Sequence, residues 1–114
     1  MIPRSDSCPR REKNAQHGSG TILLKDLAAQ DQFYGHTRLF THIIVNPGCS
    51  IGYHTHQHET EFYYILSGEA AYSDNGTQTV LRAGDVSATG HGEGHGLENR
   101  SQSPVELIAL IEQE

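Results

Sequence analysis

The chain has 114 residues, which is the size of one domain with a single modest hydrophobic core. Its formal net charge is −6, and an acidic surface repels phosphate backbones, so nucleic acid is not an expected partner. No apolar run reaches the length that spans a membrane, and the first residues lack the apolar core of a secretory signal. We therefore expect a cytoplasmic protein with no membrane contact.

Residues 1–18 are more polar than the rest of the chain and are rich in basic side chains. We predict that they form a flexible polar arm, because a segment with so few apolar residues has little to bury. Residues 19–114 are predicted to form a single folded domain. Cys8 and Cys49 are expected to be free thiols, since two cysteines in a cytoplasmic chain do not make a disulfide scaffold.

Short β-rich segments separated by turn residues make up the first half of this domain. Residues 21–25 (TILLK) predict the first strand, and residues 26–32 (DLAAQDQ) predict one helical turn. Residues 36–46 predict a long strand that ends at Pro47-Gly48.

The second half continues in the same way. Residues 61–88 predict a strand, a tight glycine corner and a hairpin, in which Asn75-Gly76 supplies the positive φ angles of a two-residue turn. Residues 95–99 and 104–111 predict the last strands. So many short strands with almost no helix predict an all-β sandwich or barrel.

The segment HTHQHETE, residues 54–61, gathers ligand-type side chains in front of a strand. Because alternate residues of a strand share a face, His54 and His56 project the same way. Glu61 begins the next strand and can return to the same cavity. A further histidine must come from elsewhere, and His95 lies between a glycine-rich turn and a strand. We predict that these four residues bind a metal, whereas His58 in the intervening loop faces solvent.

Three imidazoles and one carboxylate are ligands of intermediate hardness. We therefore expect one divalent transition metal per chain (Mn, Fe, Ni, Co, Cu or Zn) rather than Ca or Mg. Four protein ligands on an octahedral ion would leave two positions open for a small-molecule ligand. Glu59, the rival carboxylate, is expected to be solvent-exposed like His58. Residues 1 to about 15 are predicted to be dispensable for metal binding.

Two spaced motifs in the sequence resemble those of the cupin superfamily. The residues that fill them are Gly48, His54, His56, Glu61 and Gly68 in the first motif, and Gly84, Gly92, His95 and Asn99 in the second. Gly90 stands where the family usually has proline. The resemblance is to small single-domain bacterial cupins, and it implies a jelly-roll β-barrel of six to eight strands with a metal near its centre. It also implies frequent homodimers.

Strand parity places further side chains around the predicted site. Tyr63 and Ile65 share parity with Glu61, and Leu97 shares parity with His95, so we predict that these three line a substrate pocket. Asn99 is expected to tie a turn.

The resemblance does not select one reaction. We expect a metal-dependent enzyme, such as an oxygenase, lyase, decarboxylase or isomerase, acting on a small oxygenated or carboxylate metabolite that chelates the metal. A non-catalytic binding or sensing module fits the motifs equally well, and a metal-free isomerase with a histidine base is a third reading. None of Arg38, Arg82 and Arg100 is clearly inward, so the metal would supply most of the positive charge.

The oligomeric state is predicted from the strand edges that a small barrel leaves. The apolar segments TILLK and VELIALI could each pair with a neighbouring sheet, although a fully buried strand would look the same as VELIALI. Together with the resemblance, this predicts a homodimer of two-fold symmetry.

Overall fold

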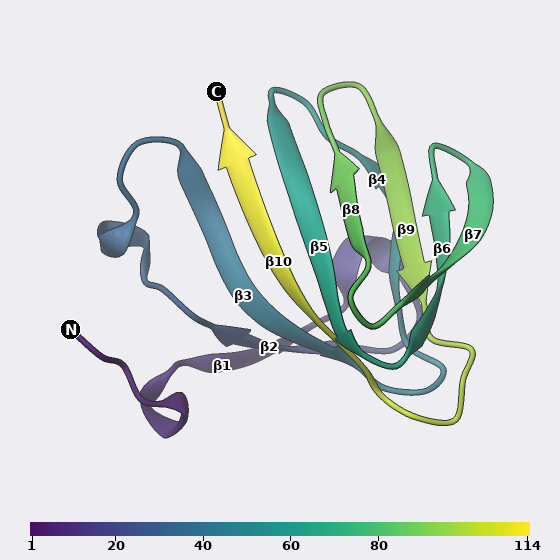
Figure 1. The fold of residues 1–114 in the computed structure, drawn as a ribbon, viewed down its shortest axis with the longest axis horizontal. Coiled ribbons are helices and arrows are strands. Elements are labelled where there is room, and N and C mark those ends of the chain that lie inside the picture. Colours follow the sequence, from purple (N-terminus) through teal and green to yellow (C-terminus); the bar gives the residue numbers. More distant parts are fainter.

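The computed structural model describes residues 1–114 as ten β-strands and three short 3-10 helices (Figure 1). The strands are β1 (Arg10–Lys13), β2 (Ile22–Asp26), β3 (Thr37–Val45), β4 (Ser50–Thr55), β5 (Glu59–Ser67), β6 (Glu69–Asp74), β7 (Thr77–Arg82), β8 (Val86–Thr89), β9 (Gly94–Glu98) and β10 (Val105–Gln113). The helices are η1 (Ser5–Ser7), η2 (Ala15–His17) and η3 (Gln30–Gln32). None of these helices has the length and apolar character needed to cross a membrane.

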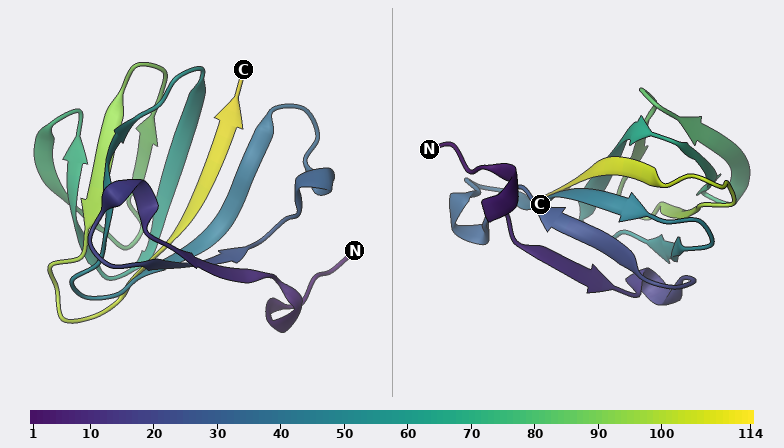
Figure 2. Two further views of the ribbon diagram at one scale, coloured as in Figure 1. Left: turned by 180° about the vertical axis from the view of Figure 1, so that it is seen from behind. Right: turned by 90° about the horizontal axis from the view of Figure 1, so that it is seen from below.

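The strands form two antiparallel sheets (Figure 2). The larger sheet has the order β1-β2-β3-β10-β5-β8, and the smaller has the order β4-β9-β6-β7. Consecutive strands therefore often lie in different sheets, as the jelly-roll topology requires. The prediction of an all-β jelly-roll barrel is confirmed.

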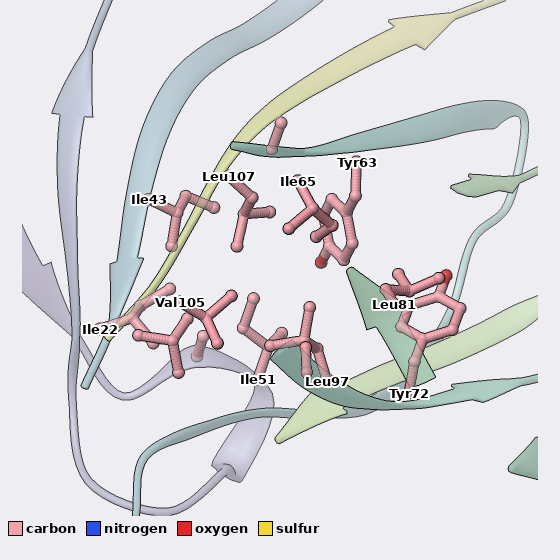
Figure 3. Packing of buried hydrophobic residues seen from close by; sticks show 14 of the residues in the cluster. Ile22, Ile43, Ile51, Tyr63, Ile65, Tyr72, Leu81, Leu97, Val105 and Leu107 are labelled. Carbon is pink, nitrogen blue, oxygen red and sulfur yellow. The ribbon is translucent and has the colours of Figure 1, made fainter. Parts of the chain in front are cut away.

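The hydrophobic core lies between the two sheets. Figure 3 shows Ile65 and Leu107 of the larger sheet pointing toward Ile51 and Leu97 of the smaller sheet, and all four side chains are buried. Burying an aliphatic side chain of this size stabilises the fold by about 1.5–3 kcal/mol.

The predicted strands match the structure closely. The segment expected at residues 21–25 is β2, which begins and ends one residue later, and the segment expected at 36–46 is β3, which is one residue shorter at each end. The hairpin turn between β6 and β7 has Asn75 at φ 51° and Gly76 at φ 88°, which is the two-residue turn that its sequence predicts.

The edges of the larger sheet differ from those expected. β10, which contains VELIALI, is central and pairs with both β3 and β5, so it offers no free edge, and its side chains alternate between buried and partly exposed instead of being buried on both faces. β2 is covered on its outer side by β1. The open edges of this sheet are therefore β1 and β8.

Part of the predicted arm lies against the barrel. Arg10–Lys13 pair with β2, and Ala15 is only 3% exposed and belongs to the hydrophobic core. Arg11 also makes a bidentate ion pair with Asp26, at 2.9 and 3.1 Å. The flexibility of residues 1–18 stays a prediction. From Arg10 onward, however, this segment pairs with β2 and packs on the core.

Candidate metal centre

Four potential metal ligands converge at one point inside the barrel. His54 lies on β4, Glu61 on β5 and His95 on β9, while His56 directly follows β4. One ligand atom from each of these four lies within 4.8 Å of the other three. His56, Glu61 and His95 are buried, and His54 is partly buried, so the cluster is enclosed on most sides.

A β-bulge aims His54 into the interior. β4 and β9 pair Ile51 with Leu97 and His54 with His95, so three steps on β4 match two steps on β9. The extra residue lets Ile51 and His54 both face inward although their spacing is odd. The bulge contains Gly52, whose carbonyl oxygen accepts a hydrogen bond of 2.7 Å from His54 Nδ1.

The ligand atoms are as close as hydrogen-bond partners. His95 Nε2 lies 3.0 Å from Glu61 Oε1, 3.0 Å from His56 Nε2 and 3.2 Å from His54 Nε2. His56 Nε2 lies 3.2 Å from the same carboxylate oxygen. Three ring nitrogens and one carboxylate oxygen thus share one small volume.

The hydrogen-bond partners of the three Nδ1 atoms determine which group the Nε2 atoms can bind. A carbonyl oxygen only accepts, so His54 Nδ1 carries a hydrogen, and neutral His54 presents a lone pair at Nε2. His56 Nδ1 lies 2.6 Å from the Glu59 carboxylate, which fixes the same tautomer. His95 Nδ1 lies 2.9 Å from both Tyr72 Oη and Thr89 Oγ1, either of which can accept. Lone pairs and a carboxylate facing one point fit a divalent transition metal.

The titration behaviour of the cluster reflects burial and mutual hydrogen bonding. Burial raises the pKa of Glu61, but hydrogen bonds with the three imidazoles outweigh it and hold that pKa well below its usual range. The hydrogen bond with Glu61 raises the pKa of His56, whereas burial lowers the pKa of His95. Glu61 is therefore ionised, and a deprotonated carboxylate is the form that binds metal.

Glu59 was wrongly expected to face solvent. Its side chain is only 13% exposed and bonds to His56 Nδ1 and, at 2.9 Å to each oxygen, to the Arg38 guanidinium. The hydrogen bond with Arg38 lowers the pKa of Glu59, so this carboxylate is ionised and accepts from both partners. His58, by contrast, is exposed as expected, with 71% of its side chain accessible.

A cavity of about 340 Å³ opens beside the cluster. Its lining includes His54, His56 and Glu61, together with aliphatic side chains from both sheets. It also includes three basic residues, Arg11, Lys13 and Arg38, so the expectation of few inward cations was wrong.

The predicted pocket residues fall into two groups. Tyr63 lines the cavity and stacks on His95, with ring centroids 4.7 Å apart. Burial raises the pKa of Tyr63 well above its usual value, so its hydroxyl stays protonated. Ile65 and Leu97 lie in the hydrophobic core and are not among the cavity-lining residues. Their contact with a ligand stays a prediction that the structure does not support.

Asn99 and Gly90 each make hydrogen bonds that hold a turn in place. Asn99 is buried and donates to the carbonyl oxygens of Val45, at the end of β3, and Ser103, at 2.8 Å each, so it ties a turn as predicted. The N–H of Gly90 donates to Glu93 Oε1 at 2.8 Å. Proline has no such donor, which gives a physical reason for the departure from the usual motif.

Comparisons with known proteins agree with this geometry. The cupin domain family matches residues 41–111. The oxalate-binding protein of Thermotoga maritima is 36% identical over 97% of this chain and 92% of its own length. A crystal structure of a predicted oxalate decarboxylase from Thermotoga maritima superposes with a TM-score of 0.94 at 35% identity, with both chains fully covered. A sugar phosphate isomerase of the cupin superfamily from Silicibacter pomeroyi has a TM-score of 0.80 at 19% identity, covering all of this chain and 76% of its own, and shares the fold. The chain belongs to the cupin superfamily.

Proposed function

We propose that the protein binds one divalent transition metal through His54, His56, Glu61 and His95, and that the metal binds a small chelating carboxylate of the oxalate class. The observation that carries this proposal is the convergence of three imidazole Nε2 atoms and one carboxylate oxygen at one point. The Nδ1 atom of each histidine has a hydrogen-bond partner outside the cluster, so Nε2 is the ring nitrogen that would bind the metal.

The cavity supports an anionic ligand. Arg11, Lys13 and Arg38 lie around it, and of these Lys13 has no ion-pair partner, whereas Arg11 and Arg38 are paired with Asp26 and Glu59. The one carboxylate of the lining, Glu61, would be bound to the metal. A bound divalent cation would add positive charge and act as a Lewis acid toward a chelating anion. A relative that is 36% identical is named an oxalate-binding protein, which favours a small dicarboxylate over a sugar or an aromatic ligand.

Binding without turnover fits the lining of the cavity better than acid–base catalysis does. A general base must lie within hydrogen-bond reach of the proton that it removes. Glu61 is occupied as a ligand, Tyr63 keeps its proton, and Glu59 is engaged by Arg38 and His56. An enzyme acting on the chelated carboxylate is the second candidate, because four protein ligands leave coordination positions open toward the cavity.

Isothermal titration calorimetry with oxalate tests the proposal. Protein loaded with Mn²⁺ is expected to bind oxalate roughly ten-fold more tightly than acetate, because only oxalate closes an unstrained five-membered chelate ring, a difference of about 1.4 kcal/mol. Protein stripped of metal is expected to give no oxalate heat. Equal oxalate affinity with and without metal would contradict the proposed role of the metal.

The same samples separate binding from catalysis. Oxalate incubated with metal-loaded protein is expected to be recovered unchanged, in air and without oxygen. Consumption of oxalate at a rate proportional to protein concentration, and its loss in the His56→Ala variant, would establish the enzyme instead.

A further inference from the structure

The three histidines of the cluster differ in what holds their outer nitrogen. His54 Nδ1 donates to a neutral carbonyl oxygen, and the partners of His95 Nδ1 are two neutral hydroxyls. His56 alone faces a carboxylate, that of Glu59, at 2.6 Å. An acceptor that carries a full negative charge increases the electron density of the imidazole and strengthens the bond from its other nitrogen to a metal.

Glu59 is itself held in place by a residue far away in the sequence. Arg38 lies on β3 and Glu59 on β5, which are the two neighbours of β10, and both guanidinium bonds are 2.9 Å long. Arg38 occupies a β-bulge, because Ile111 pairs with Leu39 and Glu112 with Thr37. The bulge lets Arg38 and its neighbour Leu39 both line the cavity, which simple alternation would forbid.

We propose that Glu59 and Arg38 are a positioning pair that makes His56 the strongest of the three imidazole ligands and thereby sets the metal affinity of the site. The inference rests on the proposed function, since it requires that His56 binds a metal. Glu59 orients the ring and polarises it, and Arg38 fixes the carboxylate in the plane that His56 needs. Neither residue touches the metal.

Metal titrations of stripped protein test the pair, with Co²⁺ as the probe because its visible absorption reports the ligand field. Glu59→Gln keeps the size of the side chain but loses its charge, so the Co²⁺ dissociation constant is expected to rise 10- to 100-fold. The Co²⁺ absorption band is expected to shift, which a purely structural role of Glu59 would not cause. Arg38→Gln should also raise the Co²⁺ dissociation constant and shift the absorption band in the same direction, but both changes should be smaller than in Glu59→Gln.

The chain offers a matched control in Arg11 and Asp26. Their ion pair is also bidentate, at 2.9 and 3.1 Å, but Asp26 accepts no hydrogen bond from a histidine. Asp26→Asn should therefore leave the Co²⁺ dissociation constant within about two-fold of the parent value, the range expected of an exposed ion pair.

Each outcome bears on the inference. Co²⁺ affinity and spectrum unchanged in Glu59→Gln overturn it. Should Glu59→Gln not fold, Arg38→Gln decides instead, because the Arg38 side chain is 44% exposed and its replacement leaves the core intact. Loss of affinity in Asp26→Asn equal to that in Glu59→Gln would also overturn it. Absence of metal binding in the parent protein would overturn the proposed function as well, whereas tight binding in both parent and Glu59→Gln would overturn the inference alone.

Discussion

At the scale of single residues, the geometry of the candidate metal centre depends on the groups that support each imidazole. His95 is completely buried and its Nδ1 lies 2.9 Å from both Tyr72 Oη and Thr89 Oγ1. A buried N–H without a partner costs about 1–3 kcal/mol, whereas an N–H with one of two acceptors left costs far less. Either hydroxyl alone can therefore accept the hydrogen bond from His95 Nδ1.

This redundancy predicts non-additive effects on metal affinity. Tyr72→Phe and Thr89→Val should each raise the metal dissociation constant by about two- to three-fold, because one acceptor remains. The double variant should raise it by about 10- to 100-fold, which exceeds the product of the single effects. Competition titrations against a chelator measure all three, and a double variant that only multiplies the single effects would show that the hydroxyls act independently.

The sequence predicts the four candidate ligands that the structure brings together, but not the residues that support them, and the reason is physical. His54, His56, Glu61 and His95 follow from short, fixed spacings on strands, so parity and motif suffice. The role of Glu59 depends on Arg38, which is 21 residues away and reaches it only because of a bulge. Bulges break the two-residue alternation without a clear mark in a single sequence.

At the scale of elements, the bulge on β4 is held from outside by the segment around η2. A side chain at Gly52 would overlap the carbonyl oxygen of Gln16, and one at Gly18 would overlap that of Ser50. Ser50 and Ser19 also share two hydrogen bonds, of 2.7 and 2.9 Å. This seam of close backbone approach lies two residues before His54.

The seam predicts that Gly52→Ala lowers both stability and metal affinity. Overpacking of this kind costs about 1–3 kcal/mol of the free energy of unfolding, and moving the Gly52 carbonyl would disturb the hydrogen bond that orients His54. Denaturant unfolding and Co²⁺ titration measure the two effects. Gly90→Ala is the control, because its added methyl group would meet only the ends of the Glu93 and Thr60 side chains. A Gly52→Ala variant with the same free energy of unfolding as Gly90→Ala would show that the close contacts at Gly52 do not matter for stability.

The contacts around Gly52 also bear on the prediction that residues 1–18 form a flexible arm. These contacts begin at Gln16, just beyond the stretch predicted to be dispensable for metal binding, and the cavity-lining Arg11 and Lys13 lie within that stretch. Low apolar content predicted an arm with nothing to bury, and this missed a segment held by strand pairing and glycine contacts. Such backbone interactions leave little trace in composition.

At the scale of the whole molecule, the outer face of the larger sheet carries a group of partly exposed apolar side chains. Register places Phe40, Leu110 and Phe62 side by side in one row, and Ile108, Tyr64 and Val86 in the next, where His42 stands on the far side of Ile108. Phe62 is 36% exposed, Tyr64 47% and Val86 61%. A contiguous apolar patch on a sheet face is typical of a protein–protein interface.

We therefore keep the prediction of a homodimer but assign it to this face rather than to strand edges. Light scattering should give a mass of about twice the 12.5 kDa of one chain, and the double variant Phe62→Lys/Tyr64→Lys should give one chain mass. Val80→Lys, on the other sheet and 37% exposed, should stay dimeric. A parent protein that remains at one chain mass on concentration would contradict the dimer.

Every role proposed for the four clustered residues requires a bound metal, and the metal content of the purified protein tests that requirement most directly. Protein expressed with added transition metals and analysed by mass spectrometry for elements should contain about one ion per chain. The His54→Ala/His95→Ala double variant should contain almost none, because two of four ligands are gone and the remaining pair cannot hold the ion. Full occupancy in that double variant, or a parent protein that takes up no transition metal, would contradict the assignment of the site.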